Sequence, residues 1–312
     1  MTPQSHELAQ LNAQLTGRVI GPDGADYDEA RTIFPGGFDS RPAAIARVAD
    51  AADVAFVIAE ARATGAELKV RAGGHSIHSV TQGGIVVDLR DLRELEIDPK
   101  ERTAWAGTGL TAGEYTAAAG EHGLATGFGD TASVGIGGIT LGGGIGYLVR
   151  KHGLTIDDLL AAEIATADGE VLMVDAESNP DLFWAIRGGG GNFGIATRFK
   201  FRLQDVATGV GGILVLPATP DAIANFLSEA DAAPEELSTI CNVMTAPPMP
   251  FLPEEYHGRP VILAMMFYAG DPDAGTPVVD RFRKLATPLA DMVRPMTYPE
   301  MYPPEEDFHP IG

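Results

Sequence analysis

Two glycine-rich stretches around one histidine are the residues of this 312-residue chain best suited to chemistry. The first is Arg71-Ala72-Gly73-Gly74-His75-Ser76, and the second runs from Gly129 to Gly146 with Asp130 as its single charge. Glycine lets a backbone approach a ligand closely, and successive exposed N–H groups form a concavity that binds anions. The first stretch therefore predicts a phosphate cradle, and the second could face a flat, uncharged ring. Either alone could be a set of turns, but together they predict a cofactor site.

His75 is the main candidate for a chemical role. The ordinary pKa of histidine leaves the imidazole mostly neutral at pH 7, so that a ring nitrogen can act as a nucleophile. The alternative is a loop histidine that lies beside a cofactor without bonding to it. Arg71, just before the glycines, could neutralise a phosphate or could pair with an acidic side chain, and the sequence does not decide between the two.

The elements expected to position these loops follow from caps and from hydrophobic periodicity. Asp50, followed by Asp53, predicts the start of a helix over 51–64 that ends at Gly65. A strand over 68–71 then delivers the first loop. The other expected helices and strands are a helix over 8–15, strands over 43–48, 85–89, 94–97 and 103–107, a helix over 111–121, a hairpin of 159–166 with 170–174, a helix from Pro180, a glycine loop over 187–194 and a strand over 195–203.

The composition changes after about Val206, where the glycine loops stop. Strands over 210–216 and 261–268 and helices over 220–230 and 276–289 are expected there, whereas 17–37 is expected to be mostly loop. Trp184 and Phe183 are expected in the core. The pattern predicts two domains, 1–206 with a core of about 38–206, and 207–312.

Charge and composition exclude several classes of partner. The net charge is −21, which argues against nucleic acid and anionic membranes, because both attract basic surfaces. No apolar run is long enough to span a bilayer, and the first residues lack the features of a signal peptide, so a cytoplasmic protein is expected. The single cysteine, Cys241, excludes an internal disulfide framework, and no metal site is predicted.

The chain resembles the FAD-linked oxidases of the vanillyl-alcohol oxidase superfamily, in the branch of the berberine-bridge-enzyme-like and 6-hydroxy-D-nicotine-oxidase-like proteins. The resemblance covers about residues 20 to 205. It rests on the two glycine loops, on Lys151-His152-Gly153-Leu154 and on the run from Asp181 through Arg187-Gly188-Gly189-Gly190-Gly191-Asn192 to Ile195. It implies an α+β fold with a PCMH-type FAD-binding domain and a second, substrate-binding α+β domain. Because members of this family are longer, 207–312 is expected to be an incomplete domain and the chain a fragment.

The resemblance also implies roles for individual residues. His75 would bond covalently to the 8α carbon of the flavin. Thr131 stands where many relatives carry a cysteine that makes a second bond, so a single attachment is expected. The adjacent carboxylates Asp157 and Asp158 could suggest acid–base chemistry, but from the residues themselves Asp157 is expected to bond to loop backbone. A catalytic residue is not assigned. The residues expected to bind FAD are Arg71, Ala72, Gly73, Gly74, His75, Ser76, Thr131, Ser133, Val134, Gly135, Gly137, Gly138, Ile139, Gly142, Asn192, Gly194 and Ile195.

The expected function is hydride transfer from a small organic substrate, such as an alcohol, an amine or a sugar-like molecule, to covalently bound flavin, with molecular oxygen as the acceptor that reoxidises it. Two alternatives stay open at this point. One is a noncovalent flavin reductase resembling UDP-N-acetylmuramate dehydrogenase, and the other is a flavin-binding protein without turnover. The substrate, the oligomeric state and the choice between oxidase and dehydrogenase do not follow from the sequence.

Overall fold

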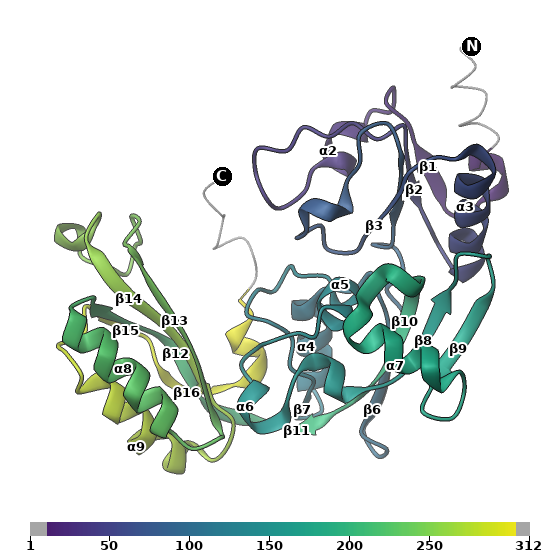
Figure 1. Ribbon diagram of the computed structural model, residues 1–312. Helices are drawn as coiled ribbons and strands as arrows, with labels where there is room; N and C mark the ends of the chain where they lie inside the picture. Colours follow the sequence, from purple (N-terminus) through teal and green to yellow (C-terminus); the bar gives the residue numbers. More distant parts are fainter. Residues whose placement is uncertain (1–10, 304–312) are drawn as a thin grey trace.

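Four β-sheets organise residues 11–303, the part of the chain that the computed structural model describes (Figure 1). Helices pack on or between three of these sheets, which confirms the expected mixture of helix and sheet. No helix within these residues is both long and apolar enough to cross a membrane.

The first sheet delivers the first glycine loop. Its order is β1-β2-β4-β3, and β2, β4 and β3 are parallel. The helix α3 connects β2 to β3 and buries Val54, Val57 and Ile58, so that β3 ends with Arg71 beside Asp88 of β4. The elements are β1 (Arg18–Ile20), α2 (Tyr27–Arg31), β2 (Ala44–Arg47), α3 (Ala51–Thr64), β3 (Leu68–Arg71) and β4 (Ile85–Asp88).

The second sheet is antiparallel, in the order β5-β6-β10-β8-β9, and supports the other two glycine loops. Tyr115, Phe128, Phe199 and Phe201 form the centre of its core. The elements are β5 (Leu95–Asp98), β6 (Thr103–Gly107), α4 (Ala112–Gly120), α5 (Ile136–Leu141), α6 (Val149–His152), β8 (Leu159–Ala165), β9 (Val171–Asp175), α7 (Pro180–Gly189) and β10 (Ile195–Arg202). The short pair of β7 (Leu124–Ala125) and β11 (Gln204–Asp205) follows at its end.

The last sheet has the order β13-β14-β12-β15, with β16 also paired to β12. Helices α8 and α9 cover one of its faces (Figure 1). The buried Tyr302 reaches back from this region, because its hydroxyl donates to the backbone oxygens of Phe128 and Gly129. The elements are β12 (Thr208–Pro217), α8 (Pro220–Ala232), β13 (Leu237–Thr245), β14 (Pro260–Tyr268), α9 (Pro272–Arg283), β15 (Ala290–Asp291) and β16 (Arg294–Thr297).

Several expectations about local structure were wrong. The second glycine stretch contains a helix, α5. The segment 17–37 is mostly loop as expected, with the short β1 and α2 inside it. The last helix lies over Pro272–Arg283 rather than 276–289, and β13 had no counterpart in the sequence analysis. Trp184 is 74% exposed, so only Phe183 packs in the core. Of the helix expected over 8–15, residues 11–14 are helical and 8–10 lie outside the described residues.

Candidate functional site

The first two glycine loops touch each other through their backbones. A Cβ atom added to Gly73 would lie 2.3 Å from the nitrogen of Gly135, and one added to Gly135 would lie 2.2 Å from the nitrogen of Gly73. Neither glycine has a positive φ, so close approach is the reason for glycine at both positions. The contact brings together two segments about sixty residues apart, and it places His75 next to the second loop.

His75 is held by two neighbours. Its Nε2 atom lies 2.8 Å from the hydroxyl oxygen of Ser133, and its ring stacks on Phe34 with centroids 4.1 Å apart and planes 19° apart. Burial lowers the pKa of His75, although nearby Asp130 and the bond to Ser133 act in the opposite direction. The imidazole is therefore neutral at pH 7, as a nucleophilic nitrogen requires.

A cavity of about 530 Å³ lies beside these loops. This volume is typical of small-molecule and cofactor sites. Eight of the residues expected to bind FAD line it, namely Ala72, Ser76, Gly137, Gly138, Gly142, Asn192, Gly194 and Ile195. His75 lies between Ala72 and Ser76 in the chain but is not itself among the residues that line the cavity.

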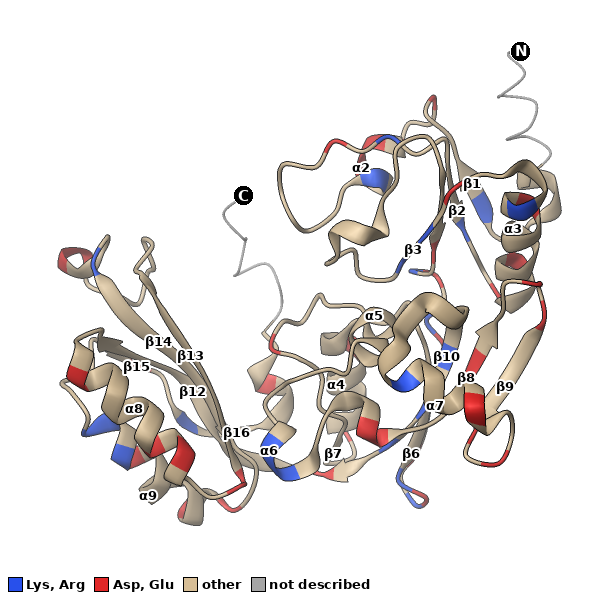
Figure 2. Ribbon diagram, viewed as in Figure 1, with Lys and Arg blue, Asp and Glu red and all other residues tan. Residues whose placement is uncertain are grey.

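The walls of this cavity are mostly backbone. A Cβ atom added to Gly138 or Gly191 would have no neighbour within 4 Å, so these glycines border open space. The helix α5, which supplies Gly137 and Gly138, carries no charged side chain (Figure 2). Such a wall offers peptide groups to a phosphate-bearing, flat ligand without a carboxylate to repel it, so the residues present fit a flavin nucleotide.

Arg71 occupies an unusual position beneath the first loop. Its side chain is 5% exposed, and its guanidinium lies against Gly74. It donates to the backbone oxygen of Ala30, whereas its buried Nε atom has no partner among the described residues. Burial and the nearby Arg90 lower the pKa of Arg71 to about 10. The acid beside it, Asp88, pairs with Arg90 at 2.7 Å, so Arg71 forms no ion pair with an acidic side chain of the described residues.

Nine of the seventeen residues expected to bind FAD are not among those that line this cavity. The Thr131 hydroxyl donates to Asp130 at 3.0 Å, and the Val134 oxygen accepts from Ala112 at 2.8 Å. Ile139 packs against the core of the second sheet. Asn192 lines the cavity, but its side-chain amide donates to the Gly189 oxygen at 2.7 Å.

Asp157 and Asp158 stay outside the cavity. Asp157 accepts from the backbone nitrogen of Leu154 at 2.8 Å, which confirms its expected bond to loop backbone. Asp158 is buried and accepts from the Gln204 amide at 2.7 Å, and burial raises its pKa to about 6.

Two side chains near the cavity were overlooked in the sequence. His78, interpreted as a surface or packing residue, lines the cavity. Phe34 lies in the segment expected to be loop, and its stacking on His75 joins positions 41 residues apart. No motif marks Phe34, and its spacing from His75 carries no periodic signal, so sequence analysis alone had no means of finding it.

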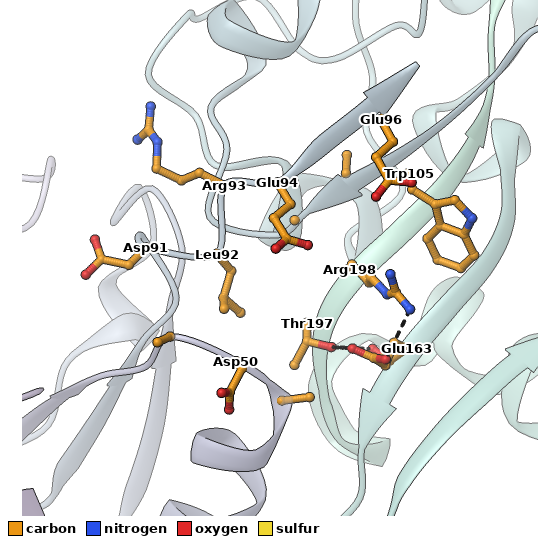
Figure 3. A pocket seen from close by; sticks show the side chains of 14 residues that line it. Asp50, Asp91, Leu92, Arg93, Glu94, Glu96, Trp105, Glu163, Thr197 and Arg198 are labelled. Atoms are coloured by element: carbon orange, nitrogen blue, oxygen red, sulfur yellow. Dashed lines mark hydrogen bonds and ion pairs between the residues drawn. The ribbon is translucent and has the colours of Figure 1, made fainter. Parts of the chain in front are cut away.

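A second cavity, of about 450 Å³, is lined by residues of β5, β6 and β10, among them Glu96, Trp105 and Arg198 (Figure 3). Five acidic side chains line it, namely Asp50, Asp91, Glu94, Glu96 and Glu163. Glu163 accepts from Thr197 at 2.7 Å and pairs with Arg198 at 3.5 Å, and that arginine lies over Trp105. None of the residues expected to bind FAD lines this cavity, and its acidic walls would repel a pyrophosphate.

Comparison with known proteins places the glycine loops in a recognised domain. Residues 42–175 match the family described as FAD binding domain. The chain is 32% identical over 291 residues to (R)-6-hydroxynicotine oxidase of Paenarthrobacter nicotinovorans, an alignment that covers 92% of this chain and 62% of that protein. The chain thus spans less than two thirds of the length of this curated relative.

Solved structures give the same result. The crystal structure of 6-hydroxy-D-nicotine oxidase from Arthrobacter nicotinovorans matches with a TM-score of 0.84 and 30% identity, over 92% of this chain and 63% of that one. A protein of Physcomitrella patens named BBE-like 1 matches with a TM-score of 0.81 and 26% identity, over 95% of this chain and 65% of that one. The resemblance expected from the glycine loops is therefore confirmed: the chain carries the FAD-binding domain and the fold of the FAD-linked oxidases of the vanillyl-alcohol oxidase superfamily, among the 6-hydroxynicotine-oxidase-like and berberine-bridge-enzyme-like proteins.

Proposed function

We propose that this protein is an FAD-dependent oxidoreductase that removes a hydride from a small organic substrate and passes the electrons to molecular oxygen. The observation that carries the proposal is the cavity walled by glycine backbone, which the residues expected to bind FAD line from three separate loops. Bound flavin would supply the hydride acceptor, while the protein supplies orientation and electrostatics.

Each loop has a separate task in this proposal. Gly73, Gly74 and Ser76 give backbone and hydroxyl donors to phosphate oxygens, and Arg71 supplies positive charge beneath them. Gly137 and Gly138 let α5 approach the flat ring, because no side chain intervenes. Asn192, Gly194 and Ile195, which line the cavity, would hold the adenine end, as the resemblance implies.

His75 is proposed to hold the flavin through one covalent bond. Support comes from its lowered pKa, from its contact with Ser133 of the second loop, and from its position in the chain between Ala72 and Ser76, which line the cavity. Thr131 is proposed to make no bond, because a hydroxyl is far less nucleophilic than the thiolate that would be needed. Its hydroxyl is already a donor to Asp130.

Residues 207–312 are proposed to form part of a substrate domain. The sheet that begins with β12 has its own core with α8 and α9, which supports a boundary near Val206. The relatives named above include an enzyme named for 6-hydroxynicotine. We infer only the broader class for this protein, a small organic molecule with an oxidisable C–H bond next to oxygen or nitrogen.

Acid precipitation of the purified, yellow protein tests this proposal. The wild type is expected to keep its flavin in the pellet, and His75→Ala to release it into the supernatant. Peptide mapping should find flavin only on the peptide that contains His75, and not on those with Thr131 or Cys241. A colourless protein that cannot be reconstituted with FAD would contradict the whole proposal, whereas released wild-type flavin would contradict only the covalent bond.

A further inference from the structure

We propose that Phe34 and Ser133 are positioning residues for the attachment of flavin, which hold the His75 ring in one orientation beside the cavity. This inference rests on the proposed covalent bond at His75. It adds two residues with a role in forming that bond, one of them from a segment outside every recognised motif.

Phe34 restrains the plane of the imidazole. The two rings are nearly parallel, with planes 19° apart and centroids separated by 4.1 Å. The backbone nitrogen of Phe34 also donates to the oxygen of Gly74, the residue next to His75, at 3.0 Å. Ring and backbone of Phe34 are therefore both attached to the loop that carries the histidine.

The segment that carries Phe34 is itself anchored. Tyr27 and Ala30 of α2 are buried, and the Tyr27 hydroxyl donates to the Pro42 oxygen at 2.7 Å. The buried Arg71, at the start of the first glycine loop, donates to the Ala30 oxygen. These contacts hold the backbone near Phe34 in place, so that its ring can restrain His75 although the Phe34 side chain is 45% exposed.

Ser133 restrains rotation of the ring within that plane. Its hydroxyl lies 2.8 Å from Nε2 of His75, and a neutral imidazole has one donor and one acceptor nitrogen. In the tautomer with hydrogen on Nε2, the ring donates to Ser133 and the other nitrogen keeps a free lone pair. The contact between Gly73 and Gly135 keeps the two loops together and maintains this bond.

Orientation matters because attachment joins two specific atoms. A C–N bond forms between an imidazole nitrogen and the 8α carbon, while one C–H bond of the methyl group and the N–H bond of the imidazole break. The two protons and two electrons released reduce dioxygen to hydrogen peroxide, which balances the reaction. A misplacement of the reacting nitrogen by 1 Å can slow such a step by about a hundredfold.

The test measures how fast acid-stable flavin appears after FAD is added to apoprotein. Phe34→Leu keeps most of the apolar volume but removes the flat ring, and Phe34→Tyr keeps the ring. Phe38→Leu is the matched control, because Phe38 lies in the same segment, is 49% exposed and has no ring partner among the described residues. Ser133→Ala removes the hydrogen bond, and Ser133→Thr restores a hydroxyl.

We expect Phe34→Leu and Ser133→Ala to attach flavin about tenfold more slowly, with the FAD affinity of Phe34→Leu within about twofold of wild type. Phe34→Tyr and Phe38→Leu should attach it at the wild-type rate, and Ser133→Thr should attach it faster than Ser133→Ala. Equal rates for Phe34→Leu and wild type would overturn the inference, as would a slower rate that Phe38→Leu reproduces. A wild type without covalent flavin would instead contradict the proposed bond itself, and the two failures are thereby distinguished.

Discussion

The two cavities of this molecule have similar volumes, about 530 and 450 Å³, but different walls. Glycine backbone forms much of the first wall, so its peptide groups face open space. Side chains form much of the second, where Glu163 and Arg198 pair with each other. The first cavity is complementary to a flat anion, whereas the carboxylates of the second would repel one.

This difference shows that volume alone does not identify a binding site. What separates the cavities is the chemistry of the lining atoms and how many are already bonded to one another. A pocket made by the absence of side chains requires glycine wherever backbone must approach backbone or ligand. Substitutions in the wall of each cavity can therefore test this difference separately.

The largest effect is expected at the contact between the glycine loops. Gly135→Ala and Gly73→Ala each place a Cβ atom within 2.3 Å of backbone nitrogen, so the loops must separate and the cradle is distorted. FAD affinity should fall by about a hundredfold or more. Fluorescence titration of the apoprotein measures it, and circular dichroism shows whether the variants stay folded. A loss below about fivefold in both folded variants would show that the contact does not shape the site.

Gly138→Ala is expected to have opposite effects on stability and on binding. The new methyl group meets nothing within 4 Å and extends into the cavity. Because alanine is a better helix former than glycine in α5, the free energy of unfolding of the apoprotein should rise by up to about 1 kcal/mol. FAD affinity should nevertheless fall by about tenfold. Thermal unfolding and FAD titration measure the two effects, and unchanged affinity would mean that the ring does not lie against Gly138.

The pH dependence of flavin attachment tests the buried histidine. Burial lowers the pKa of His75, so the neutral ring persists at pH values below its ordinary pKa of about 6.5. The attachment rate should therefore change little between pH 7.5 and about 6.5 and decline only at lower pH. The folded protein binds fewer protons here than the unfolded chain, so stability also falls as the pH drops below that value. A midpoint above about 6.5 for attachment would contradict this assignment.

The smallest effect is expected in the second cavity. Glu94→Gln with Glu96→Gln removes two of its negative charges but touches no residue that lines the first cavity. Charges more than about 8–10 Å apart are largely screened at physiological salt, so FAD affinity should stay within about twofold. The same titration checks this. A marked gain in affinity would place part of the cofactor near the acidic wall and remove the distinction between the cavities.

The sequence by itself determined the elements whose signals are local. The helix α3 begins at Asp50, whose side chain accepts from the Asp53 nitrogen at 2.8 Å, and ends at Gly65 with φ of +71°. Each signal lies within one turn of the helix end that it marks. Only half of a capping box is present there, because the Asp53 carboxylate accepts from the backbone nitrogens of Thr16, Gly17 and Ala49 rather than from that of Asp50. Ala49 is close in the chain, but Thr16 and Gly17 are 37 and 36 residues away from Asp53 and became its neighbours only through folding.

The tertiary structure alone decided the features that depend on distant neighbours. The strand β13 pairs with β14 along its whole length. The helix α5 forms in a glycine-rich stretch of low helix propensity. It is stabilised there because Ile136 packs into the core and Gly137 fits against Thr108. Glycine spacing could predict a cofactor site, because close backbone approach needs that residue type. It could not predict that Phe34 stacks on His75, because two residues 41 positions apart show no periodic pattern in the sequence. The contact forms only when α2 packs beside the first glycine loop.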